Sequence, residues 1–125
     1  MAKIKLADYI IDFYAKIGVD KIFVVYGAAN GDLIDAFSRN KKTDYVAVLH
    51  EQAGGFAAEG YAKVKGNKIP GVAIATSGPG GMNLVTPAGN CFYDSVPAIF
   101  ITGQVNSNFL RPDPSVRQIG FQEAD

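Results

Sequence analysis

Hydrophobic positions recur at two different spacings along this chain, and the spacing separates predicted helices from predicted strands. Near the start, Leu6, Ile10, Phe13 and Ile17 follow one another at three- and four-residue steps, which is typical of an amphipathic helix. Gly18 is suited to end that helix, because glycine readily adopts the conformation needed at a helix C-terminus. Further helices are predicted at 33–37, 51–65 and 82–93.

Short apolar runs separate these helices and predict strands at 21–25, 45–49, 71–76 and 97–102. Strands that alternate with helices predict an α/β fold, in which a parallel sheet is covered by helices on both faces. Such sheets bind ligands at the carboxyl ends of their strands. Three motifs fall at that end, and we expect them to converge; they lie at 27–31, 50–51 and 77–81.

Composition narrows the functional classes. Lysine plus arginine equal aspartate plus glutamate, at twelve each. Without a basic run, a nucleic-acid-binding surface is not expected, because neutralised phosphates provide most of that affinity. The single cysteine, Cys91, cannot form an internal disulfide, which fits a reducing cytoplasm. No signal peptide or membrane span is evident, so we expect one cytoplasmic domain over 1–125.

Glu51 is the first candidate for chemistry, because it follows a predicted strand and opens a predicted helix. An ordinary explanation is that the helix dipole favours a carboxylate in the first turn. The alternative rests on the apolar strand before it and the small residues after it, which predict surroundings poor in water. Desolvation raises a carboxyl pKa and suits it to acid–base work. His50, the single histidine, is expected to form a structural hydrogen bond.

The segment Ser77 to Gly81 follows a strand and leads into a helix, so its backbone N–H groups could hold a phosphate. A nucleotide-binding Rossmann-like domain is therefore an alternative. The segment lacks the third glycine and the downstream acidic residue of that motif. A glycine turn that allows close packing would explain it equally well. A regulatory or scaffold domain without activity is a third possibility.

Glycine and proline inside predicted helices need a reason. Gly54 and Gly55 each cost roughly 1 kcal/mol of helix stability relative to alanine. Close approach of another helix would offset this cost, which suggests an oligomer interface. Pro87 and Gly89 are expected to weaken or kink the helix predicted at 82–93.

Several motifs, taken together and in order, resemble the thiamine-diphosphate enzymes of the acetolactate synthase type. H-E-Q-A at 50–53 is followed by A-E-G-Y-A at 58–62. The remaining matches are T-S-G-P-G, N-L-V-T, D-S-V-P, I-T-G-Q-V and F-Q-E, at 76–80, 83–86, 94–97, 101–105 and 121–123. The resemblance covers the whole chain and identifies it as the N-terminal pyrimidine-binding (Pyr) domain of this family.

The resemblance implies a lyase or carboligase (a transferase) that acts on 2-oxo acids, in which Glu51 hydrogen-bonds N1′ of the cofactor's aminopyrimidine and activates it. The residues that it assigns to the cofactor pocket are Gly27, Glu51, Thr76, Pro79, Gly80 and Asn83. Those that it assigns to the substrate channel are Ala28, Ala29, Phe121 and Gln122. Gly54, Gly55 and Phe56 fall on a helix that pairs with a second subunit in the family.

The resemblance also implies groups that this chain would not hold alone. Magnesium and the diphosphate are bound in the family by a motif on another domain, so no metal ligands are expected here. We expect the chain to be a fragment that is truncated at its C-terminus, or else a separate Pyr subunit or a non-catalytic relic. The active site would lie between subunits of a homodimer or homotetramer. Some acetolactate synthases bind FAD, and the resemblance leaves FAD open.

Three segments, at 26–31, 54–56 and 86–90, depart from the family pattern, and the first bears on the substrate. The turn 26–31 reads Y-G-A-A-N-G, where many relatives have G-x-P-G-G. Because this turn borders the reacting atoms in the family, the difference suggests an unusual 2-oxo acid or a sugar-derived substrate.

Overall fold

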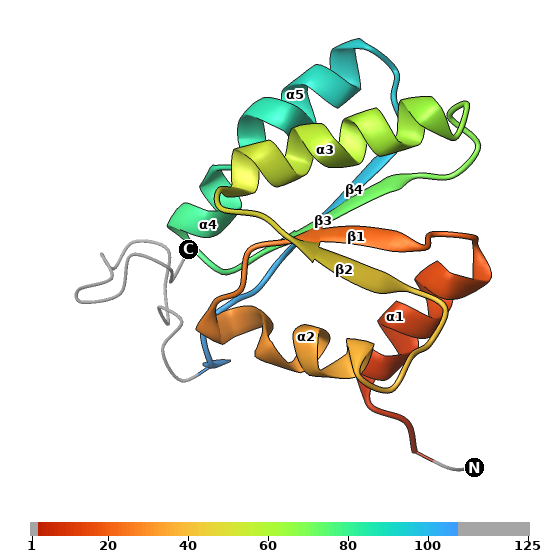
Figure 1. Cartoon of the computed structure of the whole chain (residues 1–125). Helices are drawn as coiled ribbons and strands as arrows, with labels where there is room; N and C mark the ends of the chain where they lie inside the picture. Colours follow the sequence, from red (N-terminus) through yellow and green to blue (C-terminus); the bar gives the residue numbers. More distant parts are fainter. Residues whose placement is uncertain (1–2, 108–125) are drawn as a thin grey trace.

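Four parallel strands form the centre of the chain. The computed structural model describes residues 3–107 (Figure 1). The strands are β1 (Lys21–Val24), β2 (Asp44–Ala47), β3 (Gly71–Ala75) and β4 (Ala98–Thr102). Their order across the sheet is β2-β1-β3-β4, and every neighbouring pair is parallel. The predicted α/β class is therefore confirmed.

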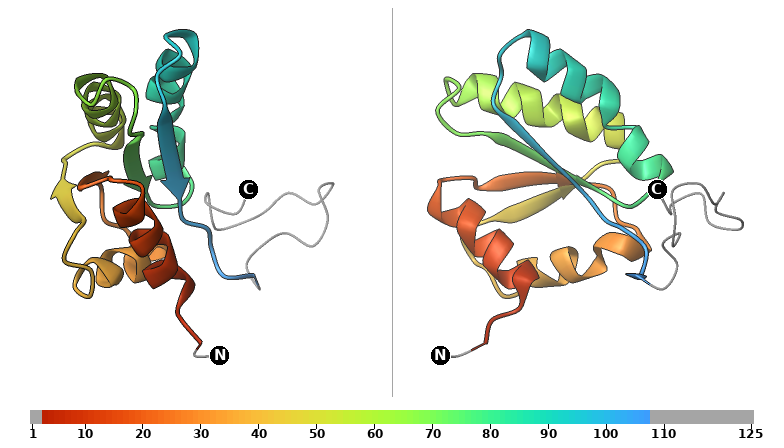
Figure 2. Two further views of the ribbon diagram at one scale, coloured as in Figure 1. Left: turned by 90° about the vertical axis from the view of Figure 1, so that its right-hand side faces the viewer. Right: turned by 180° about the vertical axis from the view of Figure 1, so that it is seen from behind.

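Helices cover both faces of this sheet, as the sequence predicted. One face is covered by α1 (Leu6–Lys16) and α2 (Gly31–Phe37), and the other by α3 (Glu51–Val64) and α5 (Val85–Tyr93). The three layers are visible from the side and from behind in Figure 2. Two short helices, η1 (Ala28–Asn30) and α4 (Pro79–Met82), follow β1 and β3 directly.

Successive side chains of a strand point to opposite faces, so the sheet divides the core in two. The α1–α2 side is filled with branched residues, which include Ile11, Ile22, Val24, Val72 and Ile74. The α3–α5 side is lined by smaller ones, which include Ala58, Ala62, Ala73 and Ala75. The small residues let α3 lie close to the sheet, since a Cβ on Gly71 of β3 would collide with the carbonyl group of Ala58.

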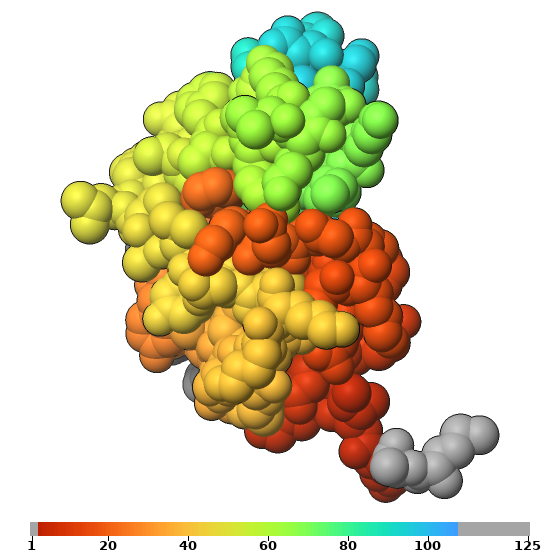
Figure 3. All heavy atoms as spheres, turned by 45° about the vertical axis from the view of Figure 1, so that its right-hand side comes forward, coloured from red at the N-terminus to blue at the C-terminus, as the bar shows by residue number. Residues whose placement is uncertain are grey.

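Strand β2 forms an exposed edge of the sheet. All four of its residues are exposed, and Leu49 just beyond it is fully exposed. In Figure 3 the atoms of β2 lie at the surface, between those of helix α3 and those of helix α1. The expectation that this apolar strand would shield Glu51 from water is therefore not met within the described residues.

The helix predicted at 82–93 is divided into two. Helix α4 ends at Met82 and α5 begins at Val85, so the break falls before Pro87 and not at it. Pro87 lies in the first turn of α5, where its missing N–H costs no hydrogen bond, and its side chain is fully buried. The predicted kink at Pro87 was wrong for this reason.

The glycines near the start of α3 make close contacts within the chain. A Cβ on Gly55 would collide with Pro87 of α5, and one on Gly54 would lie 3.0 Å from Cγ2 of Val48. The closely approaching helix is therefore α5 of the same chain. Packing within the chain therefore explains the two glycines, and their place at a subunit interface stays a prediction. Phe56 is 41% exposed, and its role in subunit pairing stays a prediction.

Candidate functional site at the carboxyl ends of the strands

The strand order creates a switch point between β1 and β3. From β1 the chain moves to one side to form β2, and it then returns to form β3 on the other side. The chain that leaves β1 leads to α2 on one face of the sheet, and the chain that leaves β3 leads to α5 on the other. Such a point is where open parallel sheets bind ligands. The loop after β1 carries Gly27, and the loop after β3 carries Thr76 and Gly80.

These two loops are in direct contact. A Cβ on Gly27 would collide with the side chain of Thr76, so only glycine allows the backbone to lie there. The backbone N–H of Ala29 donates to Oγ1 of Thr76 at 3.3 Å. The predicted pocket residues Gly27 and Thr76 are thus packed against each other across the switch point.

Gly78 allows the loop after β3 to turn back toward α3. Its φ of +57° and ψ of −118° lie in a region that residues with a Cβ rarely adopt. Pro79 follows as the first residue of α4 and is exposed, whereas Gly80 is buried. A Cβ on Gly80 would lie 2.8 Å from Cγ2 of Thr76, which places the start of α4 directly against that side chain.

Glu51 is the first residue of α3, and its two carboxylate oxygens have different surroundings. Its Oε2 accepts a hydrogen bond of 2.9 Å from Nδ2 of Asn83. Its Oε1 points toward Gly80, where a Cβ would be 3.3 Å away. Within residues 3–107, Oε1 has no hydrogen-bond partner, and the side chain is half-buried. One oxygen is therefore held by the protein while the other can meet a ligand.

His50 precedes Glu51 and caps helix α3. Its Nδ1 accepts a hydrogen bond of 3.2 Å from the backbone N–H of Gln52. A side-chain acceptor at this position satisfies one of the N–H groups that the first helical turn leaves open. The expectation of a structural hydrogen bond is confirmed, and the bond fixes where α3 begins and hence where Glu51 lies.

The structure brings together most of the predicted pocket. The residues that converge are Gly27, Glu51, Thr76, Gly80 and Asn83, with Pro79 adjoining them. Of the predicted channel residues, Ala28 is exposed and Ala29 is half-buried. Phe121 and Gln122 lie outside the described residues. The proximity of these side chains is an observation, while the role of each stays a prediction.

Sequence reasoning missed Asn30, which is 2% exposed. Its Oδ1 accepts from the backbone N–H of Gly27 and its Nδ2 donates to the carbonyl oxygen of Val25, both at 2.9 Å. Asparagine side chains often bond to nearby backbone in turns. Because Asn30 lies in the turn between Gly27 and Gly31, its position could have indicated this role. Its side chain holds the turn that carries Gly27.

The site is not built from ion pairs or metal ligands in the described part of the chain. Among residues 3–107, Glu51 takes part in no ion pair. The same residues contain no group of three or more histidine, cysteine, aspartate or glutamate side chains placed to hold a metal ion.

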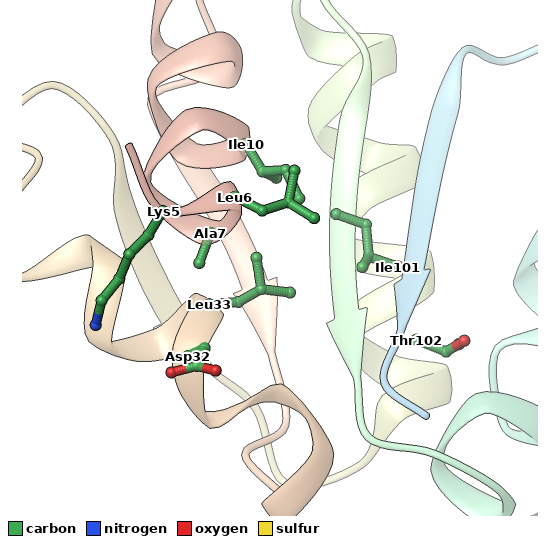
Figure 4. A pocket seen from close by; sticks show the side chains of 8 residues that line it. All are labelled: Lys5, Leu6, Ala7, Ile10, Asp32, Leu33, Ile101 and Thr102. Atoms are coloured by element: carbon green, nitrogen blue, oxygen red, sulfur yellow. The ribbon is translucent and has the colours of Figure 1, made fainter. Parts of the chain in front are cut away.

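A hollow elsewhere in the molecule does not coincide with this site. A cavity of about 640 Å³ lies beside α1, α2 and β4, on the opposite side of the sheet from α3 (Figure 4). It is lined mainly by apolar side chains, which include Leu6, Ile10, Leu33 and Ile101. Glu51 is not among its lining residues, and we assign the candidate site from the convergent polar groups instead.

Fold and site together define an α/β domain that presents a carboxylate, an amide and two glycine loops at the carboxyl ends of its strands. A family model described as "Thiamine pyrophosphate enzyme, N-terminal TPP binding domain" matches residues 4–125. The chain belongs to this family, which confirms the resemblance found in the sequence. Membership favours thiamine diphosphate over the nucleotide of a Rossmann-like domain.

Individual relatives share this region closely. The chain is 43% identical over 117 residues to "Acetolactate synthase 2, chloroplastic" of Brassica napus. It is 44% identical over 119 residues both to "Acetolactate synthase" of Mycobacterium bovis and to "Acetolactate synthase large subunit" of Corynebacterium glutamicum. These matches cover 94% or 95% of this chain, which spans only 17% or 18% of the relatives' length. In the part of the chain described here, no helix is long and apolar enough to cross a membrane.

Proposed function

We propose that this chain forms the pyrimidine-binding part of an enzyme that uses thiamine diphosphate to act on 2-oxo acids, as a lyase or carboligase. The observation that carries the proposal is the position of Glu51. Asn83 holds one carboxylate oxygen, and the other lies beside Gly80 of α4, which in turn packs against Thr76. Names of the relatives, which are acetolactate synthases, support the reaction class.

The residues present fit the aminopyrimidine of thiamine diphosphate. That ring is flat and carries hydrogen-bond donors and acceptors on its edge, so it needs a narrow space beside a polar group. Gly80 keeps the site narrow, because without a side chain it lets α4 lie where a Cβ would be 3.3 Å from Oε1 of Glu51 and 2.8 Å from Cγ2 of Thr76. Gly27 lets the opposite loop approach Thr76 equally closely. Glu51 supplies the polar group.

In this proposal each residue has a limited task. Glu51 shares a proton with N1′ of the pyrimidine, for which a half-buried carboxylate is suited. Asn83 donates to Oε2, which leaves Oε1 oriented toward the ring. Thr76 and Gly80 form one wall, and Gly27 and Ala29 fasten the other loop to it. The cofactor, when bound, supplies the stabilisation of the carbanion that a 2-oxo acid generates.

Other parts of the proposal rest on the family. Relatives about five times as long as this chain leave room for a domain that holds Mg²⁺ and the diphosphate, and for an active site completed by a second subunit. FAD remains open. A cytoplasmic location also stays a prediction, and the Brassica napus relative is chloroplastic by name.

The test is Glu51→Gln in the complete polypeptide that carries these residues. Thiamine diphosphate with Mg²⁺ is titrated by calorimetry, and turnover is measured with pyruvate as the probe substrate. We expect a loss of roughly 100-fold or more in kcat, because glutamine cannot share the proton. The unfolding temperature should stay close to that of the unmodified protein.

Glu59→Gln is the matched control, since it makes the same chemical change on the same helix. Glu59 bonds to Lys63 and Asn90 and lies away from the site. It should lower stability and leave kcat nearly unchanged. Near-normal turnover in Glu51→Gln would overturn the role given to Glu51, and failure of the unmodified polypeptide to bind the cofactor would overturn the proposed function.

A further inference from the structure

The side chain of Asn30 is buried in the turn after β1 and bonds to the backbone of Gly27, which belongs to the proposed site. Asparagine is usually exposed, yet this one is 2% exposed. Its amide is used on both sides, with Oδ1 accepting from Gly27 and Nδ2 donating to Val25, each at 2.9 Å. Its own backbone N–H donates to the Gly27 carbonyl oxygen at 3.2 Å. A buried amide that is bonded through both its oxygen and its nitrogen fixes the backbone around it.

The backbone that Asn30 fixes is one wall of the site. Gly27 lies directly against the Thr76 side chain, and Ala29 donates to Oγ1 of Thr76 at 3.3 Å. The same short segment is packed against the end of β4, where a Cβ on Gly103 would collide with Ala29. Thr76 in turn lies beside Gly80, which adjoins Glu51. A shift of the turn would therefore reach the carboxylate through three successive contacts.

We propose that Asn30 is a positioning residue of the proposed thiamine-diphosphate site. It sets the distance between the turn Gly27–Ala29 and the wall formed by Thr76 and Gly80, so that cofactor and 2-oxo acid meet Glu51 in a productive geometry. The inference rests on the proposed function and deepens it. Asn30 acts through the backbone of Gly27 and Ala29 and contacts no reacting atom.

The chain contains a matched control at the other end of the sheet. Asn40 lies in the loop between α2 and β2, and its amide is also used on both sides. Its Nδ2 donates to Oδ1 of Asp12 at 2.6 Å, and its Oδ1 accepts from the backbone N–H groups of Lys42 and Thr43 at 2.8 and 2.9 Å. Both asparagines hold a turn, but only Asn30 holds one that faces the site.

The experiment compares Asn30→Ala, Asn30→Asp and Asn40→Ala in the complete polypeptide. The unfolding temperature is recorded, thiamine diphosphate with Mg²⁺ is titrated by calorimetry, and kcat and KM for pyruvate are measured well below the lowest unfolding temperature. We expect both alanine variants to lose stability. Only Asn30→Ala should also lose kcat/KM, by about 10-fold or more, with most of the loss in kcat.

Asn30→Asp separates positioning from simple folding. It keeps the oxygen that accepts from Gly27 but loses the donor to Val25, so its kcat/KM should lie between the unmodified protein and Asn30→Ala. Where Asn30→Ala does not fold, Asn30→Asp carries the test, and a loss of about threefold is expected. Equal kcat/KM in the Asn30 and Asn40 variants overturns this inference alone. Absence of cofactor binding by the unmodified polypeptide overturns the proposed function as well.

Discussion

The two ends of the parallel sheet are built from different interactions. At the carboxyl ends of the strands, glycine contacts and hydrogen bonds connect Gly27, Thr76, Gly80 and Asn83 with Glu51. At the amino ends, charged side chains pair at the surface; the pairs are Lys21–Asp44, Lys65–Asp20 and Lys63–Asp94. Tightly packed positions tolerate few substitutions, whereas exposed ion pairs tolerate many. Substitutions at the carboxyl ends of the strands should therefore change function, and those at the amino ends should mainly change stability.

Helix α3 connects the two ends and shows the same contrast along its length. Its first turns carry Glu51, Gly54 and Gly55, and both glycines are in close contact with other elements. Further along, Gly60 is exposed, and a Cβ added there would meet nothing within 4 Å. The early glycines are needed by the fold of this chain, and the later one is not.

The largest effect is expected from Gly80→Ala. The added Cβ would lie 2.8 Å from Cγ2 of Thr76 and 3.3 Å from Oε1 of Glu51, so it would displace both and block the approach to the carboxylate. We expect turnover of pyruvate by the complete polypeptide to fall roughly 100-fold, because small displacements at a reacting centre have effects of that size. Steady-state kinetics measures this loss.

The control for that variant is Gly60→Ala, the same change at the open position of α3. Alanine there should raise the free energy of unfolding by about 0.5–1 kcal/mol, through its higher helix propensity, and leave turnover unchanged. Denaturant unfolding measures the gain. If Gly60→Ala lowered turnover as much as Gly80→Ala, the contrast between the two ends would be lost.

An intermediate effect is expected from Glu59→Gln. Glu59 is 5% exposed, and its hydrogen bonds with Lys63 and Asn90 hold the pKa of its carboxyl below the ordinary value. Removing the charge should lower the free energy of unfolding by about 1 kcal/mol at neutral pH, after allowing for the half-exposed lysine.

This difference should depend on pH in one direction. A lowered folded-state pKa contributes stability that is complete above the unfolded-state pKa of about 4.3 and is lost as the pH falls through the folded value. The free energies of unfolding of the unmodified protein and of Glu59→Gln should therefore differ by a constant amount from pH 7 to pH 5. Below pH 4 the two values should converge. Unfolding curves over that range measure it. A difference that grew toward low pH would contradict the pairing.

The smallest effect is expected from Lys21→Gln at the amino ends. Lys21 donates to Asp44 at 2.9 Å, and both side chains are largely exposed. Exposed pairs contribute little and are screened by salt. The loss in unfolding temperature should be smaller than that of Glu59→Gln and should vanish in 1 M NaCl, while turnover stays unchanged. A loss that persisted in high salt would show that the pair does more than its geometry indicates.

Much of the fold could be predicted because its signals are local. The spacing of Leu6, Ile10, Phe13 and Ile17 predicted α1, and the apolar runs predicted all four strands within one or two residues. The break between α4 and α5 could not be predicted in the same way. The break falls at Asn83 and Leu84, whereas Pro87, which was interpreted first as a local defect, fits the first turn of α5.

The candidate site was likewise predictable from the sequence only where its signals are local. The motif around Glu51 and the loop at 76–80 indicated the family, and the family assignment was confirmed. The contacts that bring Gly27, Thr76 and Asn83 to that carboxylate join residues far apart in the chain, so no local pattern contains them. Asn30 was missed because its burial depends on the strands and loops around it.

By itself, the sequence determined the α/β class, the alternation of helices with strands, and the family. Each of these depends on periodicity or on residue types at fixed spacing. Only the tertiary structure decided that Gly55 serves packing against α5, that β2 is an exposed edge, and that one oxygen of Glu51 is held while the other is directed toward Gly80. The physical reason is that steric contact, burial and hydrogen-bond direction depend on distances between segments, which a linear pattern of residues does not specify.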